Sequence, residues 1–436
     1  MNALITPRRF SAELIVPASK SHTIRQLLIA SLASGESLLY NPLDSFDARS
    51  CIKVCRAMGA KITQETTDSR TVLHVYGLGG VSGIIAPETP LDVGNSGTTL
   101  FLALAVAALA KKALIFSGDA QTEKRSAAPL LNALSMLGVK VSSRQGCIPI
   151  TVCGPVKSGR VELSCHTSQY LSALLLAVPL APAGTVVEID VPVLNERPYI
   201  EMTLSYLNTQ NIRYETNNDL SYFKLEGGNA YKPIDGFVPG DFSSSAFPAL
   251  AAAISGGSVT LHNLNPDDTQ GDKVFFTILS QMGCDVIWQK NAAEWTVTVS
   301  RNRELCALEI DLNSTPDLLP ACAVLAAFTH GKTRLYNVAH ARIKETDRIA
   351  VMAKELGKLG VECHELPDGL VIKGGVETNP KKSGERIIFN GHGDHRVVMS
   401  LAAAGLAVSG GAEILGAEAA GVTYPDFLAS IGAILT

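Results

Sequence analysis

The chain of 436 residues is 46% hydrophobic and 18% charged, with a formal net charge of −4. It is longer than the roughly 250–300 residues at which single cores stop growing, so we expect two globular domains. The slightly acidic balance excludes a general attraction to nucleic acid or acidic membranes, so an anion site requires a local concentration of Lys and Arg. The longest apolar run, residues 100–110, is about half the roughly 20 residues of a membrane helix and predicts a buried helix.

The start of the chain and its cysteines indicate a cytoplasmic protein. Arg8 and Arg9 are not followed by an apolar segment of signal-peptide length. The nine cysteines are scattered and form no CxxC pair, and their odd number argues against a complete disulfide framework. Cys51 and Cys55 lie at helical spacing without neighbouring ligand residues, so we expect no metal site.

Taken in order, the chain repeats one pattern six times: a polar or charged segment, an Ala/Leu-rich helix, a glycine and a β-branched strand. Successive helix starts lie about 70–78 residues apart, close to a sixth of the chain, which is typical of a repeat architecture. Helices that are nearly all apolar must be buried on every side, so we expect three at the centre of each domain, with sheets and outer helices around them. The predicted buried helices are 24–32, 100–110, 171–180, 247–254, 318–328 and 397–408.

A second, more amphipathic helix follows in each repeat and ends at a Met-Gly or Leu-Gly pair, as at Met58-Gly59 and Leu359-Gly360. Six mixed α/β repeats in two domains give three repeats each. The Pro/Gly-rich segment 227–236 marks the boundary, and the N-terminal strand around 14–16 is expected to form the second crossing. We therefore predict a first domain over 19–234 and a second over 1–18 and 235–436.

The densest charge cluster is the run 342–348, Arg-Ile-Lys-Glu-Thr-Asp-Arg. Apolar residues follow it at three- and four-residue spacing as far as Leu359, so we expect the cluster to form the first turn of an amphipathic helix. Two cations around a carboxylate at a helix N-terminus suit an anionic substrate and a carboxylate proton carrier. A solvated helix end would show the same pattern.

Polar phrases at the other predicted helix starts extend this idea. Six buried helices of similar direction would aim their N-termini at one interdomain region and make it an anion trap. Taken singly, Asp394-His395-Arg396 could be a salt-bridged helix cap, Lys20 a surface lysine and Gly94–Thr98 a tight turn. Their joint occurrence at the same place in each repeat favours a functional site. The charged residues expected there are Lys20, Arg25, Arg125, Asp317, Lys344, Glu345, Arg348, His395 and Arg396.

An ordered set of motifs along nearly the whole chain carries a resemblance to a known family. The motifs are Pro17-Ala18-Ser19-Lys20-Ser21 with Arg25, Gly94-Asn95-Ser96-Gly97-Thr98, Arg125, Ser168-Gln169, Arg197-Pro198-Tyr199-Ile200, Pro239-Gly240-Asp241 with Ser243-Ser244, Pro316-Asp317, Lys344-Glu345-Thr346-Asp347-Arg348 and Asp394-His395-Arg396. In these the chain resembles the enolpyruvyl transferase family, and within it the 5-enolpyruvylshikimate-3-phosphate (EPSP) synthases.

The resemblance implies a mixed-sheet α/β fold, a two-domain inside-out α/β barrel in which each domain holds three βαβαββ repeats around buried parallel helices and the domains close over the substrates. It implies transfer of the enolpyruvyl group of phosphoenolpyruvate to the 5-hydroxyl of shikimate 3-phosphate, with release of phosphate through a tetrahedral intermediate and with no metal or cofactor. The first domain would mainly bind the acceptor phosphate, and the second would carry acid/base and donor-binding residues. We expect a cytoplasmic monomer without nucleic-acid or membrane partners.

The same resemblance assigns residues to roles. Asp317 and Glu345, assisted by Lys20, would move protons. Arginine forks suit carboxylate and phosphate groups. Shikimate 3-phosphate would be held by Lys20, Ser21, Arg25, Thr167, Ser168, Gln169, Asp317 and Lys344. Phosphoenolpyruvate would be held by Lys20, Gly97, Arg125, Gln169, Arg348 and Arg396.

Four positions depart from the family's pattern. Thr167 replaces the first serine of a Ser-Ser-Gln phosphate grip but keeps a hydroxyl, and Glu196 stands where a phosphate-binding serine is usual. His340 aligns with a position that is Asn in some members, and Val422 replaces a lysine that usually reaches phosphoenolpyruvate. These departures bear on the acceptor's phosphate contact and on donor affinity, and they leave the proton-transfer residues intact.

Three other functions fit the same scaffold. Enolpyruvyl transfer to a UDP-amino sugar would require a reactive cysteine in the loop before the donor arginine, and residues 111–125 contain none. Transfer to another hydroxylated ring acid stays open. A non-catalytic phosphometabolite-binding protein would have lost the acid/base residues, whereas Asp317, Glu345 and Lys20 are present.

Overall fold

The computed structural model describes residues 1–67, 70–291, 294–377 and 385–436. These residues form two compact units: unit 1 comprises Met1–Pro17 and Pro239–Thr436, and unit 2 comprises Ala18–Val238. The chain therefore leaves unit 1 after Pro17 and returns to it at Pro239. The different chemical roles expected for the two domains stay a prediction.

One sheet topology occurs six times in the described residues, as four-stranded sheets with three in each unit. In every sheet the first two strands are parallel, and the other neighbours are antiparallel. The strand orders are β14-β3-β5-β4, β6-β7-β9-β8 and β10-β11-β13-β12 in unit 2, and β16-β17-β15-β2 (read from its last strand), β18-β19-β21-β20 and β22-β23-β1-β24 in unit 1. This repetition confirms the predicted six-repeat organisation.

The strands are short, as expected for β-branched segments between glycine turns. Those of unit 2 are β3 (Glu36–Tyr40), β4 (Lys61–Thr67), β5 (Arg70–Tyr76), β6 (Leu91–Asp92), β7 (Leu114–Ser117), β8 (Lys140–Arg144), β9 (Cys147–Cys153), β10 (Gly159–Glu162), β11 (Val186–Asp190), β12 (Tyr214–Thr216), β13 (Tyr222–Glu226) and β14 (Asp235–Phe237). Those of unit 1 are β1 (Asn2–Ile5), β2 (Ser11–Ile15), β15 (Ser258–His262), β16 (Asp285–Asn291), β17 (Glu294–Ser300), β18 (Glu309–Asp311), β19 (Gly331–Tyr336), β20 (Glu362–Leu366), β21 (Gly369–Gly374), β22 (Ile387–Asn390), β23 (Ala412–Leu415) and β24 (Ile434–Leu435).

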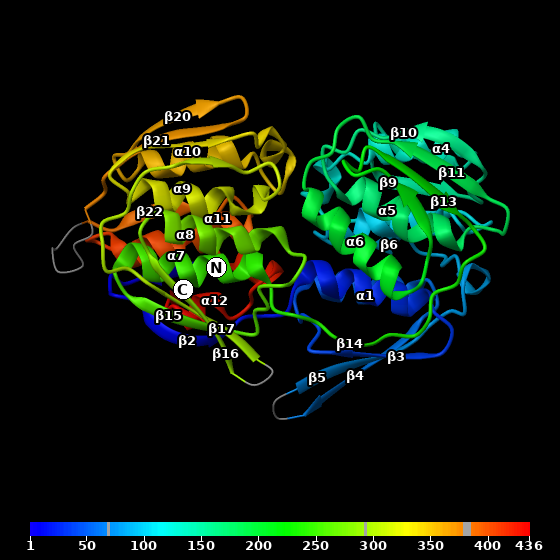
Figure 1. Ribbon diagram of the computed structural model, residues 1–436, viewed down its shortest axis with the longest axis horizontal. Coiled ribbons are helices and arrows are strands. Elements are labelled where there is room, and N and C mark those ends of the chain that lie inside the picture. Colours follow the sequence, from blue (N-terminus) through cyan, green and yellow to red (C-terminus); the bar gives the residue numbers. More distant parts are fainter. Residues whose placement is uncertain (68–69, 292–293, 378–384) are drawn as a thin grey trace. The chain divides into compact units, whose positions relative to one another are not determined.

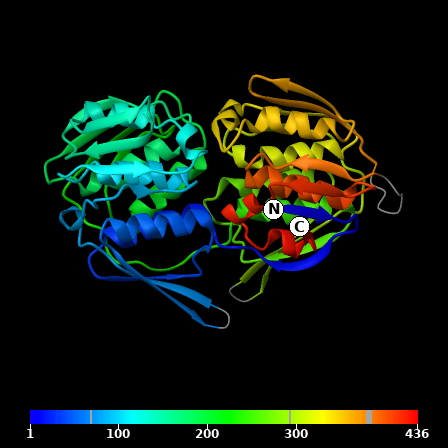
Figure 2. The same ribbon diagram turned by 180° about the vertical axis from the view of Figure 1, so that it is seen from behind.

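Both crossings between the units are made by strands. β2 leads into the first helix of unit 2 but pairs in parallel with β15 of unit 1. β14 leads into the first long helix of unit 1 but pairs in parallel with β3 of unit 2. The two chain ends complete one sheet of unit 1, because β1 lies between β23 and β24 and the N–H of Asn2 donates to the carbonyl oxygen of Thr436 at 2.9 Å. Figures 1 and 2 show both termini in this unit.

The first helix of each repeat is buried along nearly its whole length, because its residues are almost all apolar. Figure 1 shows α9, α11 and α7 of unit 1 between the β20–β21 hairpin and the β15–β17 pair. α3 packs on α5 in unit 2, and α11 packs on both α7 and α9 in unit 1. These helices are α1 (Lys20–Leu32), α3 (Gly97–Ala107), α5 (Gln169–Ala177), α7 (Phe242–Ser255), α9 (Leu319–Ala327) and α11 (His395–Ala407).

The second helices bury one face only, as their amphipathic sequences predict. In α10 the buried face includes Ile349, Met352 and Leu356. The second helices are α2 (Phe46–Ala57), α4 (Ala128–Met136), α6 (Arg197–Thr209), α8 (Val274–Gln281), α10 (Arg348–Gly357) and the short α12 (Phe427–Ser430). Short 3₁₀ helices are η1 (Val81–Gly83), η2 (Thr122–Lys124), η3 (Val178–Leu180), η4 (Gly271–Lys273), η5 (Pro316–Leu318), η6 (Ala339–Ile343) and η7 (Ala417–Val422).

The prediction that residues 342–348 form the first turn of a helix is wrong. α10 begins only at Arg348, because the carboxylate of the N-cap residue Asp347 accepts from the N–H of Ala350 at 3.0 Å. Arg342 is drawn away from the helix, since it pairs with Asp347 at 2.7 Å and with Glu365 at 2.8 Å. Residues 344–346 consequently form a bend between η6 and the N-cap of α10.

Candidate active site

A fully buried arginine organises the charged groups of unit 1. Arg348 is 0% exposed, and its guanidinium donates to three carboxylates. Nη1 bonds Oδ1 of Asp317 at 2.7 Å, Nη2 bonds Oε2 of Glu345 at 2.7 Å, and Nε bonds Oδ2 of Asp394 at 2.8 Å. Asp317 also accepts from Nη2 of Arg396 at 2.7 Å. We call these five residues the Arg348 cluster.

The elements of the last two repeats bring this cluster together. Asp317 lies in η5, immediately before α9, and Glu345 lies in the bend before α10. Asp394 is the N-cap of α11, where its carboxylate also accepts from the N–H groups of Arg396 and Val397. Each charged group thus sits at or just before a helix N-terminus, where carboxylates are stabilised by unpaired N–H groups.

The charge on Asp317 follows from its neighbours. Burial opposes its ionisation, but the positive charges of Arg396, Lys344 and Arg348 outweigh this effect and hold the pKa of Asp317 well below its ordinary value. Asp317 is therefore an ionised carboxylate at neutral pH and can accept a proton.

Asp272 is a further buried carboxyl group of unit 1, held in η4 and 1% exposed. One oxygen accepts a short hydrogen bond from the hydroxyl of Ser243 in α7. Its Oδ1 has no hydrogen-bond partner among the described residues. Burial and the negative charge of Asp317 raise the pKa of Asp272 to about 7, against the opposing charge of Arg396. Asp272 therefore changes charge near neutral pH beside the Arg348 cluster.

Two cations of unit 2 lie on α1. Lys20 opens the helix, and its Nζ lies 3.2 Å from Oδ2 of Asp47 in α2. Arg25, one turn later, is 1% exposed. Its Nε donates to the hydroxyl of Thr203 at 2.9 Å, and its Nη1 donates to the carbonyl oxygen of Ser21 at 3.1 Å.

The partners of Arg25 are all uncharged. Its Nη2 donates to the hydroxyl of Ser172 at 3.2 Å and to the carbonyl oxygen of Tyr199 at 3.3 Å. Burial lowers the pKa of Arg25 to about 10, so it stays protonated at neutral pH. Among the described residues, no carboxylate is bonded directly to this buried charge, so Arg25 favours an anion nearby.

The segment before α5 presents hydroxyl and amide donors to a carboxylate. The hydroxyls of Thr167 and Ser168 donate to Oε2 of Glu196 at 3.1 Å and 2.7 Å. The backbone N–H of Ser168 donates to the same oxygen at 2.9 Å. Gln169 opens α5, and its buried Oε1 has no hydrogen-bond partner in the described chain.

Gly97 lies directly against Arg125. It opens α3 after the N-cap Ser96, whose hydroxyl accepts from the N–H of Thr99 at 3.2 Å. A Cβ at Gly97 would overlap Nη1 of Arg125. The absence of a side chain at Gly97 is therefore what allows the guanidinium to lie there.

The remaining positions singled out from the sequence lie in unit 1. Lys344, in the bend before α10, acts on Asp317 through its charge. His340 is buried, and its Nε2 lies 3.1 Å from the carbonyl oxygen of Asn313. Val422 is 7% exposed at the end of η7.

The predicted residues fall into separate groups. Asp317, Glu345, Arg348 and Arg396 are joined by hydrogen bonds in unit 1. In unit 2, Gly97 meets Arg125, and Thr167, Ser168 and Gln169 are consecutive at the start of α5. Sequence reasoning missed three carboxylates that contact or face these groups: Asp47, Asp272 and Asp394. Asp394 appeared as a possible helix cap and as part of a family motif but was given no role at the site, and no sequence signal joined Asp47 to Lys20.

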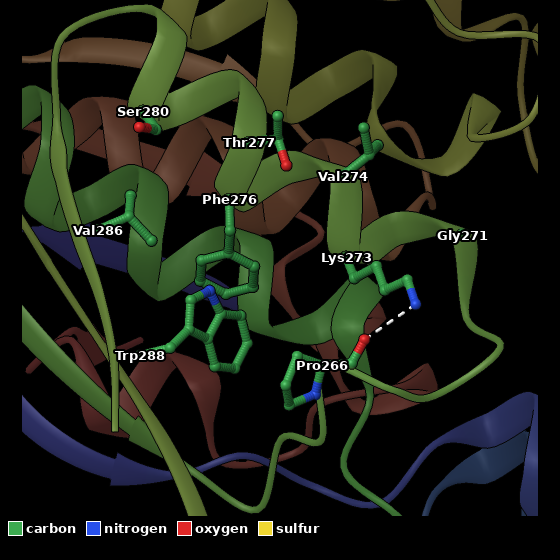
Figure 3. Close-up of a pocket in the computed structure, with 9 residues that line it drawn as sticks. All are labelled: Pro266, Gly271, Lys273, Val274, Phe276, Thr277, Ser280, Val286 and Trp288. Carbon is green, nitrogen blue, oxygen red and sulfur yellow. Dashed lines mark hydrogen bonds between the residues drawn. The ribbon is translucent and has the colours of Figure 1, made fainter. Parts of the chain in front are cut away.

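A separate hollow of about 520 Å³ lies between α8 and β16 of unit 1 and contains none of the predicted site residues. Figure 3 shows Phe276 and Trp288 at its centre, where their rings meet edge to face, and Lys273 donates to the carbonyl oxygen of Pro266 at 2.9 Å. In the described ranges we find no group of three or more His, Cys, Asp or Glu arranged to hold a metal ion. No described helix is long and apolar enough to span a membrane.

Repeated α/β units with arginines and carboxylates paired at helix N-termini supply the charged groups that a binding site for small anionic substrates requires. The profile of the EPSP synthase (3-phosphoshikimate 1-carboxyvinyltransferase) family matches residues 5–431. The chain belongs to this family and is a transferase, which confirms the family expected from the motifs.

Individual relatives agree along nearly the whole chain. The 3-phosphoshikimate 1-carboxyvinyltransferase of Acetivibrio thermocellus is 46% identical over 420 residues, covering 96% of this chain and 94% of the relative. That of Ruminiclostridium cellulolyticum is 44% identical over 423 residues, covering 97% and 95%. A solved structure of EPSP synthase from Acinetobacter baumannii has a TM-score of 0.80 at 26% identity, covering 98% of this chain and 97% of that one. The predicted α/β fold class is thereby confirmed.

Proposed function

We propose that this chain transfers the enolpyruvyl group of phosphoenolpyruvate to the 5-hydroxyl of shikimate 3-phosphate, with Asp317 and Glu345 as the proton carriers. Family membership supports the reaction. The observation that supports the residue roles is the Asp317 carboxylate, which accepts from both Arg348 and Arg396 at 2.7 Å.

The reaction needs two proton transfers in each half. In the addition, the acceptor's hydroxyl oxygen bonds to C2 of the donor, a base removes the hydroxyl proton, and an acid protonates the donor's methylene carbon. In the elimination, a base removes a methyl proton, the C–O bond to phosphate breaks as the vinyl ether forms, and the departing phosphate takes up the proton that came from the acceptor's hydroxyl. No oxidant and no net proton donor is required, so two carboxyl groups that exchange protons suffice.

Asp317 is the better candidate for the hydroxyl proton, because its neighbours hold it ionised in the free protein. Binding of phosphoenolpyruvate would change the charge around Asp317. The phosphate and carboxylate of phosphoenolpyruvate would take up charge from Arg348 and Arg396, which weakens their hold on Asp317 and raises its basicity. Glu345, which shares Arg348 with Asp317, would take up a proton once phosphoenolpyruvate draws charge from that arginine, and this proton is the one that it gives to the methylene carbon.

The groups of unit 2 fit the binding roles. Lys20, Ser21, Arg25, Thr167, Ser168 and Gln169 would hold shikimate 3-phosphate, together with Asp317 and Lys344. Lys20, Gly97, Arg125 and Gln169 would hold phosphoenolpyruvate, together with Arg348 and Arg396. The uncharged partners of Arg25 support a phosphate near this cation, and the Oε1 of Gln169, which has no partner among the described residues, can accept from a hydroxyl of shikimate 3-phosphate.

We further propose that the protein acts as a cytoplasmic monomer without metal or organic cofactor. All nine cysteines lie in the described part of the chain and are free thiols, as in proteins of reducing compartments. Sedimentation equilibrium of the purified protein tests the monomer, and full activity after exhaustive chelation tests the absence of a metal.

The assay for the reaction is phosphate release from phosphoenolpyruvate. We expect release with shikimate 3-phosphate and none with UDP-N-acetylglucosamine as acceptor. The near-isosteric Glu345→Gln variant should bind both substrates yet turn over about two orders of magnitude more slowly. Release with the UDP-sugar alone would contradict the acceptor, and equal loss of binding and turnover in Glu345→Gln would make Glu345 a structural residue.

A further inference from the structure

The carboxylate of Glu196 has the contacts of a bound anion. One oxygen, Oε2, takes all three hydrogen bonds from Thr167 and Ser168, at 2.7–3.1 Å. One of these donors is a backbone N–H just before α5, where a helix N-terminus favours negative charge. The residue is only 2% exposed, so the carboxylate has exchanged water for these donors.

The backbone at Glu196 indicates that this contact is specific. Glu196 is the N-cap of α6, with φ +60 and ψ +40, a left-handed conformation that residues other than glycine adopt rarely. Its side chain makes no capping hydrogen bond to α6, although capping is the usual reason for a polar residue at this position. The side chain instead accepts from Thr167 and Ser168, which lie at the N-terminus of another helix, α5.

The nearby buried cation completes an anion-binding environment. Arg25 is surrounded by hydroxyl and carbonyl partners, and the negative charge of Glu196 is one of the influences that raise its pKa against burial. Thr167, Ser168 and Arg25 are also the groups assigned above to shikimate 3-phosphate. A phosphate dianion and an ionised carboxylate cannot share these donors without strong repulsion.

We propose that Glu196 is an internal competitor for the acceptor's phosphate: its carboxylate occupies the phosphate position in the free enzyme and is displaced when shikimate 3-phosphate binds. This inference rests on the proposed function for the identity of the acceptor. Glu196 thereby sets the affinity for phosphorylated acceptors, because each binding event must break its three hydrogen bonds. An acceptor without a phosphate group can bind without breaking these hydrogen bonds.

Isothermal titration calorimetry on the full chain tests the proposal with three probes: shikimate 3-phosphate, shikimate and inorganic phosphate. In Glu196→Ser the side chain is too short to reach the donors, and it carries no charge. We expect this variant to bind shikimate 3-phosphate and inorganic phosphate about tenfold more tightly or better, since charge-assisted hydrogen bonds no longer have to be broken. Affinity for shikimate should change by less than about twofold on the same argument.

Two further variants keep the test decisive. Glu196→Gln retains the shape of the side chain and removes its charge, so its affinity for shikimate 3-phosphate and for inorganic phosphate should lie between those of wild type and Glu196→Ser. If the serine variant does not fold, the glutamine variant alone tests the competitor role. Glu201→Gln is the control, because Glu201 is on the same helix, exposed, and paired with Arg197 at 2.8 Å. It should bind like wild type.

The outcomes separate the two proposals. Unchanged or weaker phosphate binding in both Glu196 variants overturns the competitor role. If inorganic phosphate binds more tightly in these variants while shikimate 3-phosphate binds none of the proteins, the competitor role stands and the proposed acceptor is wrong.

Discussion

Replacing Arg348 by methionine should weaken unit 1 more than any exposed charge replacement. Methionine fills most of the space but leaves Asp317, Glu345 and Asp394 without the guanidinium that now bonds all three at 2.7–2.8 Å. Breaking a buried ion pair by removing one partner costs about 3–5 kcal/mol, because the remaining charge is left uncompensated. We therefore expect the free energy of unfolding of unit 1 to fall by about that amount at pH 7.

The two tryptophans make unit 1 separately observable. Trp288 and Trp295 are the chain's only tryptophans, and both belong to unit 1. Their rings lie 6.5 Å apart, and Trp288 packs on Phe276 at 5.4 Å (Figure 3). Urea unfolding followed by tryptophan fluorescence therefore reports unit 1, and linear extrapolation of the transition gives its free energy of unfolding.

The pH dependence provides an internal check. Arg348 is one of the charges that hold the pKa of Asp317 below its ordinary value, so the wild-type protein gains stability from this carboxylate above the unfolded pKa of 3.8 and loses it as pH falls below that value. The variant has lost this contribution in part. The difference in free energy of unfolding between wild type and Arg348→Met should therefore become smaller as the pH falls below 3.8.

Arg303→Met serves as the control, because Arg303 is 71% exposed and its ion pair with Asp285 is 3.3 Å long. Such exposed pairs contribute about 1 kcal/mol or less. Equal losses in Arg303→Met and Arg348→Met, or a loss under about 1 kcal/mol in Arg348→Met, would refute the claim that the buried guanidinium holds the cluster together.

Three further predictions concern single groups. The pKa of Asp272 is raised from 3.8 to about 7 in the folded protein, so wild type loses stability as pH rises between these values. The free energy of unfolding of Asp272→Asn in urea, relative to that of wild type, should therefore increase from pH 5 to pH 8 by an amount on the order of 2 kcal/mol. A difference between the two proteins that stays constant with pH would contradict the raised pKa. In Gly97→Ala the new methyl group must displace Arg125, so the KM for phosphoenolpyruvate should rise about tenfold while that for shikimate 3-phosphate stays near wild type; steady-state kinetics with an unchanged donor KM would remove Arg125 from the donor site. Lys20→Ala should lower kcat/KM at least about tenfold with an unchanged circular dichroism spectrum, whereas near-normal kinetics would exclude Lys20 from the site.

The repeated helices could be predicted from the sequence because their signals are local. Apolar composition predicts burial wherever the helix packs. The helices expected from residues 24, 100, 171, 247 and 397 are present, but each begins two to five residues earlier, inside the polar phrase that precedes the apolar run. The same local reasoning predicted six mixed α/β repeats, because each has the same order of polar segment, helix, glycine and strand, whereas the βαβαββ arrangement was implied by the family resemblance.

The pairing of charges could not be predicted in this way. The run 342–348 looked like one helical turn, but Asp347 caps the helix so that it begins at Arg348. Arg342 pairs with Glu365, and Arg348 pairs with Asp317 and Asp394. Which carboxylate pairs with which arginine depends on how the repeats pack on one another, and a sequence pattern does not specify the distances between side chains of different repeats.

The site in unit 2 shows a second kind of limit. The resemblance marked Glu196 as unusual, but its contact with Ser168 depends on a left-handed backbone at a glutamate, which residue preferences disfavour. Lys20 was expected at the site, whereas its partner Asp47 lies on another helix and carries no motif. Residues that complete a site through the fold are thus harder to find than those that open its helices.

The placement of the chain ends affects how the protein is made on the ribosome. Every strand of unit 2 is synthesised in one stretch, from β3 to β14, so this unit can complete its sheets while translation continues. The first two strands are synthesised long before their partners. β2 can pair with β15 only after unit 2 has been synthesised, and β1 pairs with β23 and β24, which emerge about 400 residues later. A ribosome that stopped just before β24 would release a folded unit 2 and a first strand that lacks one of its two neighbours.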